Sequence, residues 1–251
     1  MRFDPDPTQD TLPHLPFFAN RSIEKVRRIP TRTGGNTLWE VASGGTRYTV
    51  RRWERREGNP AVEAAVTALA AHYGIAPQVM AFDSKIPAMV TAYVAGVHRQ
   101  KLARAALSRL AQVLRMLHGI DTHALDLPTI ALNTMIEADR SEITLALETI
   151  AYHPPSAVLC HHDLNPGNII WGAHTVTLID FEYAGLNDPC FDVAAVCVEF
   201  DLDGDAEAWW LGAYYGAERP AGIDEKLAAY KVLYRALCRQ WNARLDRDQI
   251  P

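Results

Sequence analysis

The sequence predicts an α+β fold of two lobes, in which a small β-rich N-terminal lobe, residues 1–95, precedes a mostly helical C-terminal lobe, residues 96–251. Three observations predict this class. Strand-like runs separated by turn signals are concentrated in the first part of the chain. Longer patterns with helical spacing of apolar residues dominate the part that follows. No internal repeat interrupts this order of strands first and helices later.

The composition is that of an ordinary globular protein, with 48% hydrophobic and 22% charged residues among 251. This length is enough for one large domain or two packed lobes. The formal net charge of -5 provides no basic surface overall, so we expect neither nucleic acid nor an anionic membrane as a partner.

The chain carries no sign of a membrane or secretory destination. No apolar run is long enough to span a bilayer, and the acidic, proline-bearing start MRFDPDPTQD is unlike a signal peptide. The cysteines show no C-x-x-C spacing and are interpreted as small buried residues in a reducing compartment; they are Cys160, Cys190, Cys197 and Cys238. The sequence therefore predicts a cytoplasmic location.

The first lobe begins with an irregular arm and a hairpin. Prolines recur through residues 1–20, which predicts an arm without regular structure, and a strand pattern begins at Ile29. The β-rich runs 36–42 and 46–53 flank Ser43-Gly44-Gly45. Two such runs around a Gly-Gly pair are typical of a β-hairpin.

A helix and two further strands follow in the first lobe. Asn59 is suited to cap a helix, and Pro60 to its first turn, so we expect a helix over 60–72 that Gly74 ends. The runs 78–83 and 88–94 predict strands joined by a short turn.

The second lobe carries apolar residues at helical spacing in several long segments. The predicted helices span residues 101–118, 133–151, 205–216 and 224–246.

One stretch, Leu159–Asp192, holds the residues that point most clearly to chemistry. His161, Asp163 and Asn168 form the pattern H-x-D-x-x-x-x-N, and the strand-like TVTLID places Asp180 twelve residues after the asparagine. Asp163 is the candidate general base, because a hydroxyl proton needs an acceptor within hydrogen-bond reach. The oxygens of Asn168 and Asp180 suit Mg²⁺, which prefers hard oxygen ligands. Each residue alone is unremarkable, but their joint spacing indicates phosphoryl transfer.

The same parts occur in protein kinases, as a loop aspartate, a metal asparagine and the aspartate of D-F-G. Here Asp180-Phe181-Glu182 replaces D-F-G, and the run DFEYAGLNDP resembles the choline/ethanolamine kinase family, within the wider group that includes the aminoglycoside phosphotransferases. The resemblance covers roughly residues 30–200 and is strongest over 159–192. It implies a two-lobed protein-kinase-like fold with ATP and Mg²⁺ as cofactors.

The resemblance also implies a nucleotide site in the first lobe. Arg51, on the second strand of the hairpin, matches the strand cation that holds the phosphates. Glu63 is expected to pair with it, although a glutamate near a helix N-terminus is also favoured by the helix dipole. The backbone of Thr91-Ala92-Tyr93 is expected to meet the adenine edge. Asn36 ends the turn Thr33-Gly34-Gly35-Asn36, which is either a phosphate contact or only a tight turn that needs positive φ.

Two further residues have structural roles in the related family. His161 is expected to brace the loop and the residues after the metal aspartate, and Asp192 to hold the loop through backbone amides. An N-terminal helix acid is an equally simple explanation of Asp192. The run His161-His162-Asp163 also suggests a transition-metal site, but no further cluster of ligand spacing lies near it in the sequence.

The acceptor is predicted from aromatic and acidic residues. Quaternary ammonium groups are held against aromatic faces and carboxylates, and the candidates for such a site are Glu182, Trp209, Trp210, Tyr214 and Trp241. Contact with a second Mg²⁺ is an equally weighted hypothesis for Glu182, which lies beside Asp180. The alternative is an aromatic-rich helical core. Many eukaryotic choline kinases carry an aromatic residue where this chain has Asn187-Asp188-Pro189, a version closer to bacterial choline and thiamine kinase relatives.

We therefore expect an ATP- and Mg²⁺-dependent kinase that phosphorylates a primary alcohol of a small cationic metabolite. Choline or ethanolamine is the first choice, thiamine the second, and an aminoglycoside or a sugar the third. A nucleotide-binding pseudokinase without turnover is the alternative of another class. The presence of Asp163, Asn168, Asp180 and Arg51 together argues against it.

Overall fold

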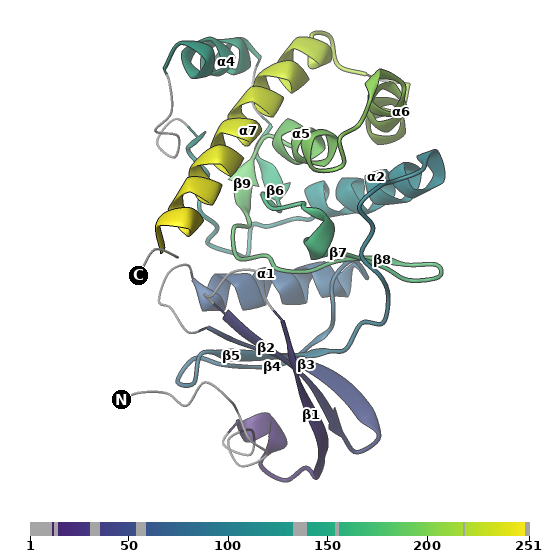
Figure 1. The fold of residues 1–251 in the computed structure, drawn as a ribbon, viewed down its shortest axis with the longest axis vertical. Coiled ribbons are helices and arrows are strands. Elements are labelled where there is room, and N and C mark those ends of the chain that lie inside the picture. Colours follow the sequence, from purple (N-terminus) through teal and green to yellow (C-terminus); the bar gives the residue numbers. More distant parts are fainter. Residues whose placement is uncertain are drawn as a thin grey trace. The chain divides into compact units, whose positions relative to one another are not determined.

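The structure is a computed structural model of the chain that describes residues 12, 15–30, 36–53, 59–132, 140–153, 156–217 and 219–248. The chain divides into two compact units, Met1–Ala95 and Gly96–Pro251. The first contains a five-stranded sheet and the second is mostly helical, which confirms the predicted α+β class (Figure 1).

The first unit is built on an antiparallel sheet in the order β1-β2-β3-β5-β4. Its strands are β1 (Ile23–Ile29), β2 (Asn36–Ser43), β3 (Thr46–Trp53), β4 (Val79–Asp83) and β5 (Ala88–Ala92). The predicted β2–β3 hairpin is confirmed, and Gly44 and Gly45 supply its positive φ angles of 60° and 70°.

Strand β1 corrects one expectation, because it ends at Ile29, where the sequence pattern had placed a strand start. Among the described strands, β1 lies at the edge of the sheet and pairs with β2 alone. Its half-buried positions recur every third residue rather than every second one. The strand is therefore specified by backbone pairing and leaves no two-residue alternation to recognise.

The sheet is packed on both faces. Trp39 and Val41 of β2 lie in one apolar cluster with Leu15 and Phe18 of the N-terminal arm, which forms a short 3₁₀ turn there. On the opposite face, Trp53 packs with Ala64 of helix α1 (Pro60–His72) and with Met89 of β5. Alternate residues of β3 therefore point to the arm and to α1, and Arg51 lies on the α1 face.

Helix α1 begins where the sequence predicts. The Asn59 side chain accepts hydrogen bonds from the backbone N–H groups of Ala61 and Val62, and Pro60 occupies the first turn. The helix ends at His72, followed by Gly74 with a φ of 74°. These local signals fix the helix so that Glu63 faces the sheet and is 3% exposed.

The second unit contains helices α2 (Arg104–His118), α4 (Arg140–Tyr152), α5 (Cys190–Glu199), α6 (Gly204–Tyr215) and α7 (Ile223–Asp248). α7 packs against α5 and α4, and α6 packs against α2 (Figure 1). Helices α2, α4, α6 and α7 agree with the predicted segments, except that residues 133–139 of one prediction lie outside the described part. Helix α5 is the helix that an N-terminal helix acid at Asp192 implies. None of the helices described here is long and apolar enough to cross a membrane.

Two small antiparallel ribbons carry the motif residues. β6 (Val158–Cys160) pairs with β9 (Gly185–Asn187), and β7 (Ile169–Trp171) pairs with β8 (Val176–Leu178). β8 is the strand expected within TVTLID. The others are too short to show a side-chain period, so the sequence does not reveal them.

The cysteines are free thiols, as the sequence predicts. Cys160, Cys190 and Cys197 are buried and Cys238 is half-buried. Burial raises the pKa of Cys190 to about 12 and that of Cys238 to about 11. These thiols therefore stay protonated at neutral pH.

Candidate active site

Residues 161–168, which follow β6, form a loop that we call the H-x-D loop. One buried carboxylate holds the start of this loop. Asp192, in the first turn of α5 and 0% exposed, accepts the N–H of His161 on Oδ2 at 2.7 Å and the N–H of His162 on Oδ1 at 2.9 Å. Burial raises the pKa of Asp192, but the hydrogen bond from His118 and the surrounding histidines outweigh it and lower the pKa to about 2. Asp192 is therefore an ionised anchor for the loop.

His161 links the H-x-D loop to the segment that carries Asp180. Its ring is buried, and Nε2 donates to the carbonyl of Ile179 at 2.9 Å, while Nδ1 accepts the N–H of Asp163 at 3.3 Å. The ring also lies 4.6 Å from that of Phe181. These contacts are those of a brace between the two segments.

His162, to which the sequence assigns no role, ties the loop to β9. Its backbone is in the left-handed region, with φ of 66°. Burial lowers the pKa of its ring to about 4, so the imidazole is neutral and Nε2 accepts the Asn187 amide N–H at 3.0 Å. Asp188 caps the N–H of Cys190 at 2.9 Å and pairs with Lys226 of α7. The Asn187-Asp188-Pro189 segment is therefore structural, a junction between the loop, α5 and α7.

Asp163 presents a carboxylate whose position is set by two amides. Asn168 Nδ2 donates to Oδ2 at 2.6 Å and to the backbone carbonyl of Asp163 at 2.9 Å. Asn165 Nδ2 donates to Oδ1 at 2.9 Å. Both oxygens accept hydrogen bonds, which fixes the plane of the carboxylate.

The β7–β8 ribbon brings the two candidate metal ligands to one end. Asn168 directly precedes β7 and Asp180 follows β8, and the N–H of Ile179 donates to the carbonyl of Asn168 at 3.0 Å. Because the amide nitrogen of Asn168 is bound to Asp163, its amide oxygen is directed away from that residue. An amide oxygen and a carboxylate at the same end of a ribbon are a donor set that fits Mg²⁺.

In the first unit, Arg51 and Glu63 form the ion pair that the sequence predicts. The Arg51 guanidinium lies 3.3 Å from Glu63 Oε1, and the two side chains are 7% and 3% exposed. Trp53 Nε1 donates to the other carboxylate oxygen at 2.9 Å, and the Trp53 ring lies 5.6 Å from the guanidinium carbon. The strand cation is therefore fixed in place by α1 and by its own strand.

The adenine contact expected at Thr91-Ala92-Tyr93 stays a prediction. The N–H of Ala92 donates to the carbonyl of Gln78 at 2.8 Å, and the N–H of Tyr93 donates to the carbonyl of Arg47 at 3.1 Å. These two donors are therefore used within the first unit. Asn36 opens β2 opposite Trp53, and the rest of its glycine-bearing turn lies outside the described residues.

The sequence profile described as "Phosphotransferase enzyme family" (APH) matches residues 28–235. The chain belongs to this family. A curated relative, Protein LicA of Haemophilus influenzae, is 42% identical over 55 residues, which are 22% of this chain and 21% of that protein. The match with LicA therefore spans about a fifth of either protein.

Solved structures show the same fold. The choline kinase LicA from Streptococcus pneumoniae superposes with a TM-score of 0.80 at 19% identity, covering 97% of this chain and 92% of that one. A structure of LicA in complex with AMP gives a TM-score of 0.74 at 20% identity, covering 92% and 87%. This phosphotransferase therefore has the kinase-like fold that the sequence predicts.

Two of the aromatic residues expected to bind substrate lie in the interior of this phosphotransferase. Trp210 is 0% exposed, and its Nε1 donates to the carbonyl of Val193 at 3.1 Å. Tyr214 is 8% exposed, and its hydroxyl is bound to His118. Because both side chains are enclosed by α2 and α5, the expectation that they contact a substrate is wrong.

The two exposed tryptophans have different surroundings. Trp209 donates to Ser108 Oγ at 3.1 Å, and the Arg104 guanidinium lies 5.0 Å from its ring. That ring already faces a cation of α2, so we remove Trp209 from the candidate substrate site. Trp241 of α7 packs edge-to-face on Tyr183, with ring centroids 5.9 Å apart, and Tyr183 directly follows Glu182.

Several residues of the site were not found by sequence reasoning. Tyr183 and Asn165 lie within the motif stretch but carry no spacing that marks them. His118 ends a predicted helix, where the helix dipole favours a histidine, and the sequence indicates no further role for it. Its contact with Asp192 joins residues 74 apart in the chain, so only the tertiary structure reveals it.

The ion pair in the first unit gives a testable prediction. Replacing Glu63 by alanine removes the carboxylate partner of a buried guanidinium, which typically costs about 3–5 kcal/mol. Urea denaturation of Glu63→Ala should show a loss of this size. The matched control is Glu142→Ala, an exposed glutamate also in the first turn of a helix, which should change stability by less than about 0.5 kcal/mol. Equal losses for the two variants would contradict a buried pair.

Proposed function

We propose that this phosphotransferase transfers the γ-phosphate of ATP, with Mg²⁺, to the primary hydroxyl of a small cationic alcohol, with choline or ethanolamine preferred. The observation that carries the proposal is the set of carboxylates around Tyr183. Burial raises the pKa of Tyr183, and the charges of Glu182, Asp163 and Asp180 raise it further. Tyr183 therefore lies near three carboxylates, one of which is the candidate base.

A negative field next to aromatic rings favours a cation. Tyr183 is 37% exposed and Trp241 is 43% exposed, so both rings are accessible at their point of contact. A quaternary or primary ammonium on such a ring gains about 0.5–2 kcal/mol. The carboxylates add a Coulomb attraction that a neutral sugar would not feel.

The neighbouring face of α7 extends the same chemistry. The hydroxyl of Tyr234 donates to Glu199 Oε1 at 2.9 Å, and the Cys238 thiol lies 3.9 Å from the same oxygen. After burial and Glu199, the charge of Asp163 is a further cause of the raised pKa of Cys238. This supports a site bounded by the H-x-D loop, the residues after Asp180 and α7.

Each residue has a defined task in the proposed transfer. Asp163 accepts the proton of the attacking hydroxyl, and the amides of Asn165 and Asn168 hold its carboxylate in the required plane. Asn168 and Asp180 would hold Mg²⁺, which supplies positive charge to the phosphate oxygens. Arg51, fixed by Glu63, would bind the phosphates of the nucleotide from the first unit.

A coupled ADP-release screen over choline, ethanolamine, thiamine and kanamycin tests the proposal. We expect turnover with choline or ethanolamine that depends on Mg²⁺. Asp163→Ala should lower kcat by roughly 10²–10⁴-fold, the contribution of a general base. A protein that Mg·ATP stabilises in a thermal-shift titration, but that releases ADP with none of the four alcohols, would instead be a nucleotide-binding pseudokinase. Turnover with kanamycin alone would overturn the choice of acceptor.

The cation site gives a second prediction, for which the chain offers a matched control. Trp241 and Trp209 are equally exposed, at 43% each, and lie on different helices. Trp241→Leu should raise KM for the cationic alcohol roughly 3- to 30-fold, the equivalent of one cation–π contact, with little change in KM for ATP. Trp209→Leu should leave both KM values unchanged. If Trp209→Leu had the larger effect on the alcohol, the proposed site would be wrong.

A further inference from the structure

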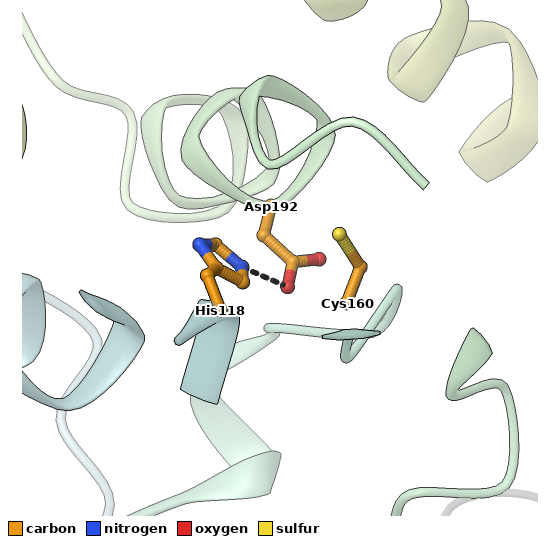
Figure 2. Close-up of side chains that lie close together, drawn as sticks. All are labelled: His118, Cys160 and Asp192. Atoms are coloured by element: carbon orange, nitrogen blue, oxygen red, sulfur yellow. Dashed lines mark hydrogen bonds and ion pairs between the residues drawn. The ribbon is translucent and has the colours of Figure 1, made fainter. Parts of the chain in front are cut away.

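A chain of buried hydrogen bonds continues from Asp192 away from the H-x-D loop. His118, the last residue of α2, lies with Nε2 3.1 Å from Asp192 Oδ2 and Nδ1 2.6 Å from the hydroxyl oxygen of Tyr214. Figure 2 shows His118 and Asp192 facing each other from two helices, with Cys160 beside them. All of these side chains are buried. We call the three linked residues the Tyr214–His118–Asp192 chain.

The hydrogen-bond partners show which atoms of the Tyr214–His118–Asp192 chain carry protons. The ionised carboxylate of Asp192 only accepts, so His118 Nε2 carries a proton and donates it to Oδ2. Burial raises the pKa of Tyr214, so its hydroxyl keeps its proton. The Tyr214 hydroxyl is hydrogen-bonded to Nδ1, so both ring nitrogens of His118 are held, and Tyr214 fixes the orientation in which the imidazole meets Asp192.

Two members of this chain, together with Cys160, are residue types that can bind a metal, but their ligand atoms are used in other ways. His118, Cys160 and Asp192 have potential ligand atoms within 4.8 Å of one another. Both ring nitrogens of His118 and both oxygens of Asp192 are already hydrogen-bonded. Burial, first, and the charge of Asp192 raise the pKa of the Cys160 thiol well above its usual value, which opposes the thiolate that a metal needs. The cluster is therefore a hydrogen-bond network.

The position of Tyr214 is itself fixed from two sides. Arg115, one helical turn before His118, donates to the carbonyls of Ala213 and Tyr214 at 2.6 Å and 3.3 Å. Trp210, one turn before Tyr214, is bound through its indole N–H to the carbonyl of Val193, next to Asp192. These hydrogen bonds hold the backbone of α6 at Tyr214, so the Tyr214 hydroxyl has a fixed position relative to His118.

We propose that Tyr214 is a positioning residue for phosphoryl transfer: through His118 it orients the Asp192 carboxylate, which holds the backbone at His161 and His162 and so sets the place of Asp163. This inference rests on the proposed function, because Asp163 is its catalytic end. Two N–H groups directly before Asp163 depend on one carboxylate, so a rotation of that carboxylate displaces the base. Small displacements of a reacting group lower kcat and leave substrate affinity largely unchanged.

Steady-state kinetics distinguish a positioning role of Tyr214 from a role in substrate binding. Tyr214→Phe removes only the hydroxyl and keeps the ring. We expect kcat to fall about tenfold, with KM for the alcohol and for ATP within about twofold of wild type. The matched control is Tyr215→Phe, the adjacent tyrosine of α6, whose hydroxyl interacts with Cys190 rather than with His118. It should keep the wild-type kcat. A rise in KM without loss of kcat in Tyr214→Phe would overturn the proposal.

Variants of His118 test the link itself. A glutamine amide nitrogen can approach the position of Nε2 and donate to Asp192, whereas an asparagine amide nitrogen approaches that of Nδ1 and cannot. His118→Gln should therefore retain several-fold more kcat than His118→Asn, at equal folded fraction by circular dichroism. Equal loss in both variants would mean that His118 acts only by filling space.

A measurement made without substrate tests the Tyr214–His118–Asp192 chain separately from the proposed function. Hydrogen exchange of the amides of His161 and His162 reports directly on their bonds to Asp192. We expect exchange about fivefold to tenfold faster in Tyr214→Phe than in wild type, and unchanged in Tyr215→Phe, because one hydrogen bond contributes about 1 kcal/mol. Unchanged exchange in Tyr214→Phe would contradict the positioning role. If exchange were faster in Tyr214→Phe but the wild-type protein were inactive on every alcohol, the Tyr214–His118–Asp192 chain would be supported and the proposed function would be wrong.

Discussion

The carboxylate of Asp192 is the constraint on which the second unit depends, because it is fully enclosed and must be satisfied by hydrogen bonds. Two backbone N–H groups of the H-x-D loop and the imidazole of His118 satisfy it. Hydrogen bonds to a charged group contribute about 1.5–3 kcal/mol each, whereas an unpartnered buried charge costs several kcal/mol. The loop is therefore held in one conformation, and His162 stays in the left-handed region next to the candidate base.

From this anchor the site is assembled by short-range structure. His161 connects the loop to Ile179, and the β7–β8 ribbon places Asn168 beside the segment of Asp180. The amide nitrogen of Asn168 orients Asp163, and its amide oxygen is the atom that would hold Mg²⁺ in the proposed function. In the first unit, the buried pair Arg51–Glu63 gives the strand cation the same kind of rigidity. Rigid charges that need no rearrangement are what phosphoryl transfer requires of a protein.

The features that the sequence predicts are those that local spacing determines. Asp163, Asn168 and Asp180 meet because a loop and a short ribbon join them, and Glu63 reaches Arg51 because a capped helix follows a hairpin. The aromatic residues of α6 could not be sorted in this way. Trp210 and Tyr214 lie on one side of α6 and Trp209 on another, but the helix has no clear apolar face, so only its packing on α2 shows which are enclosed. His118 was missed for the same reason, because its partner lies on another helix.

A crystal structure with Mg²⁺, a non-hydrolysable ATP analogue and choline would test the central claim most directly, namely that Asp163 meets the hydroxyl of a cation held by α7. We predict the choline hydroxyl within hydrogen-bond distance of the Asp163 carboxylate, with its trimethylammonium group against Trp241 and Tyr183. A hydroxyl directed away from Asp163, or an ammonium group bound on the α6 face beside Trp209, would contradict this account.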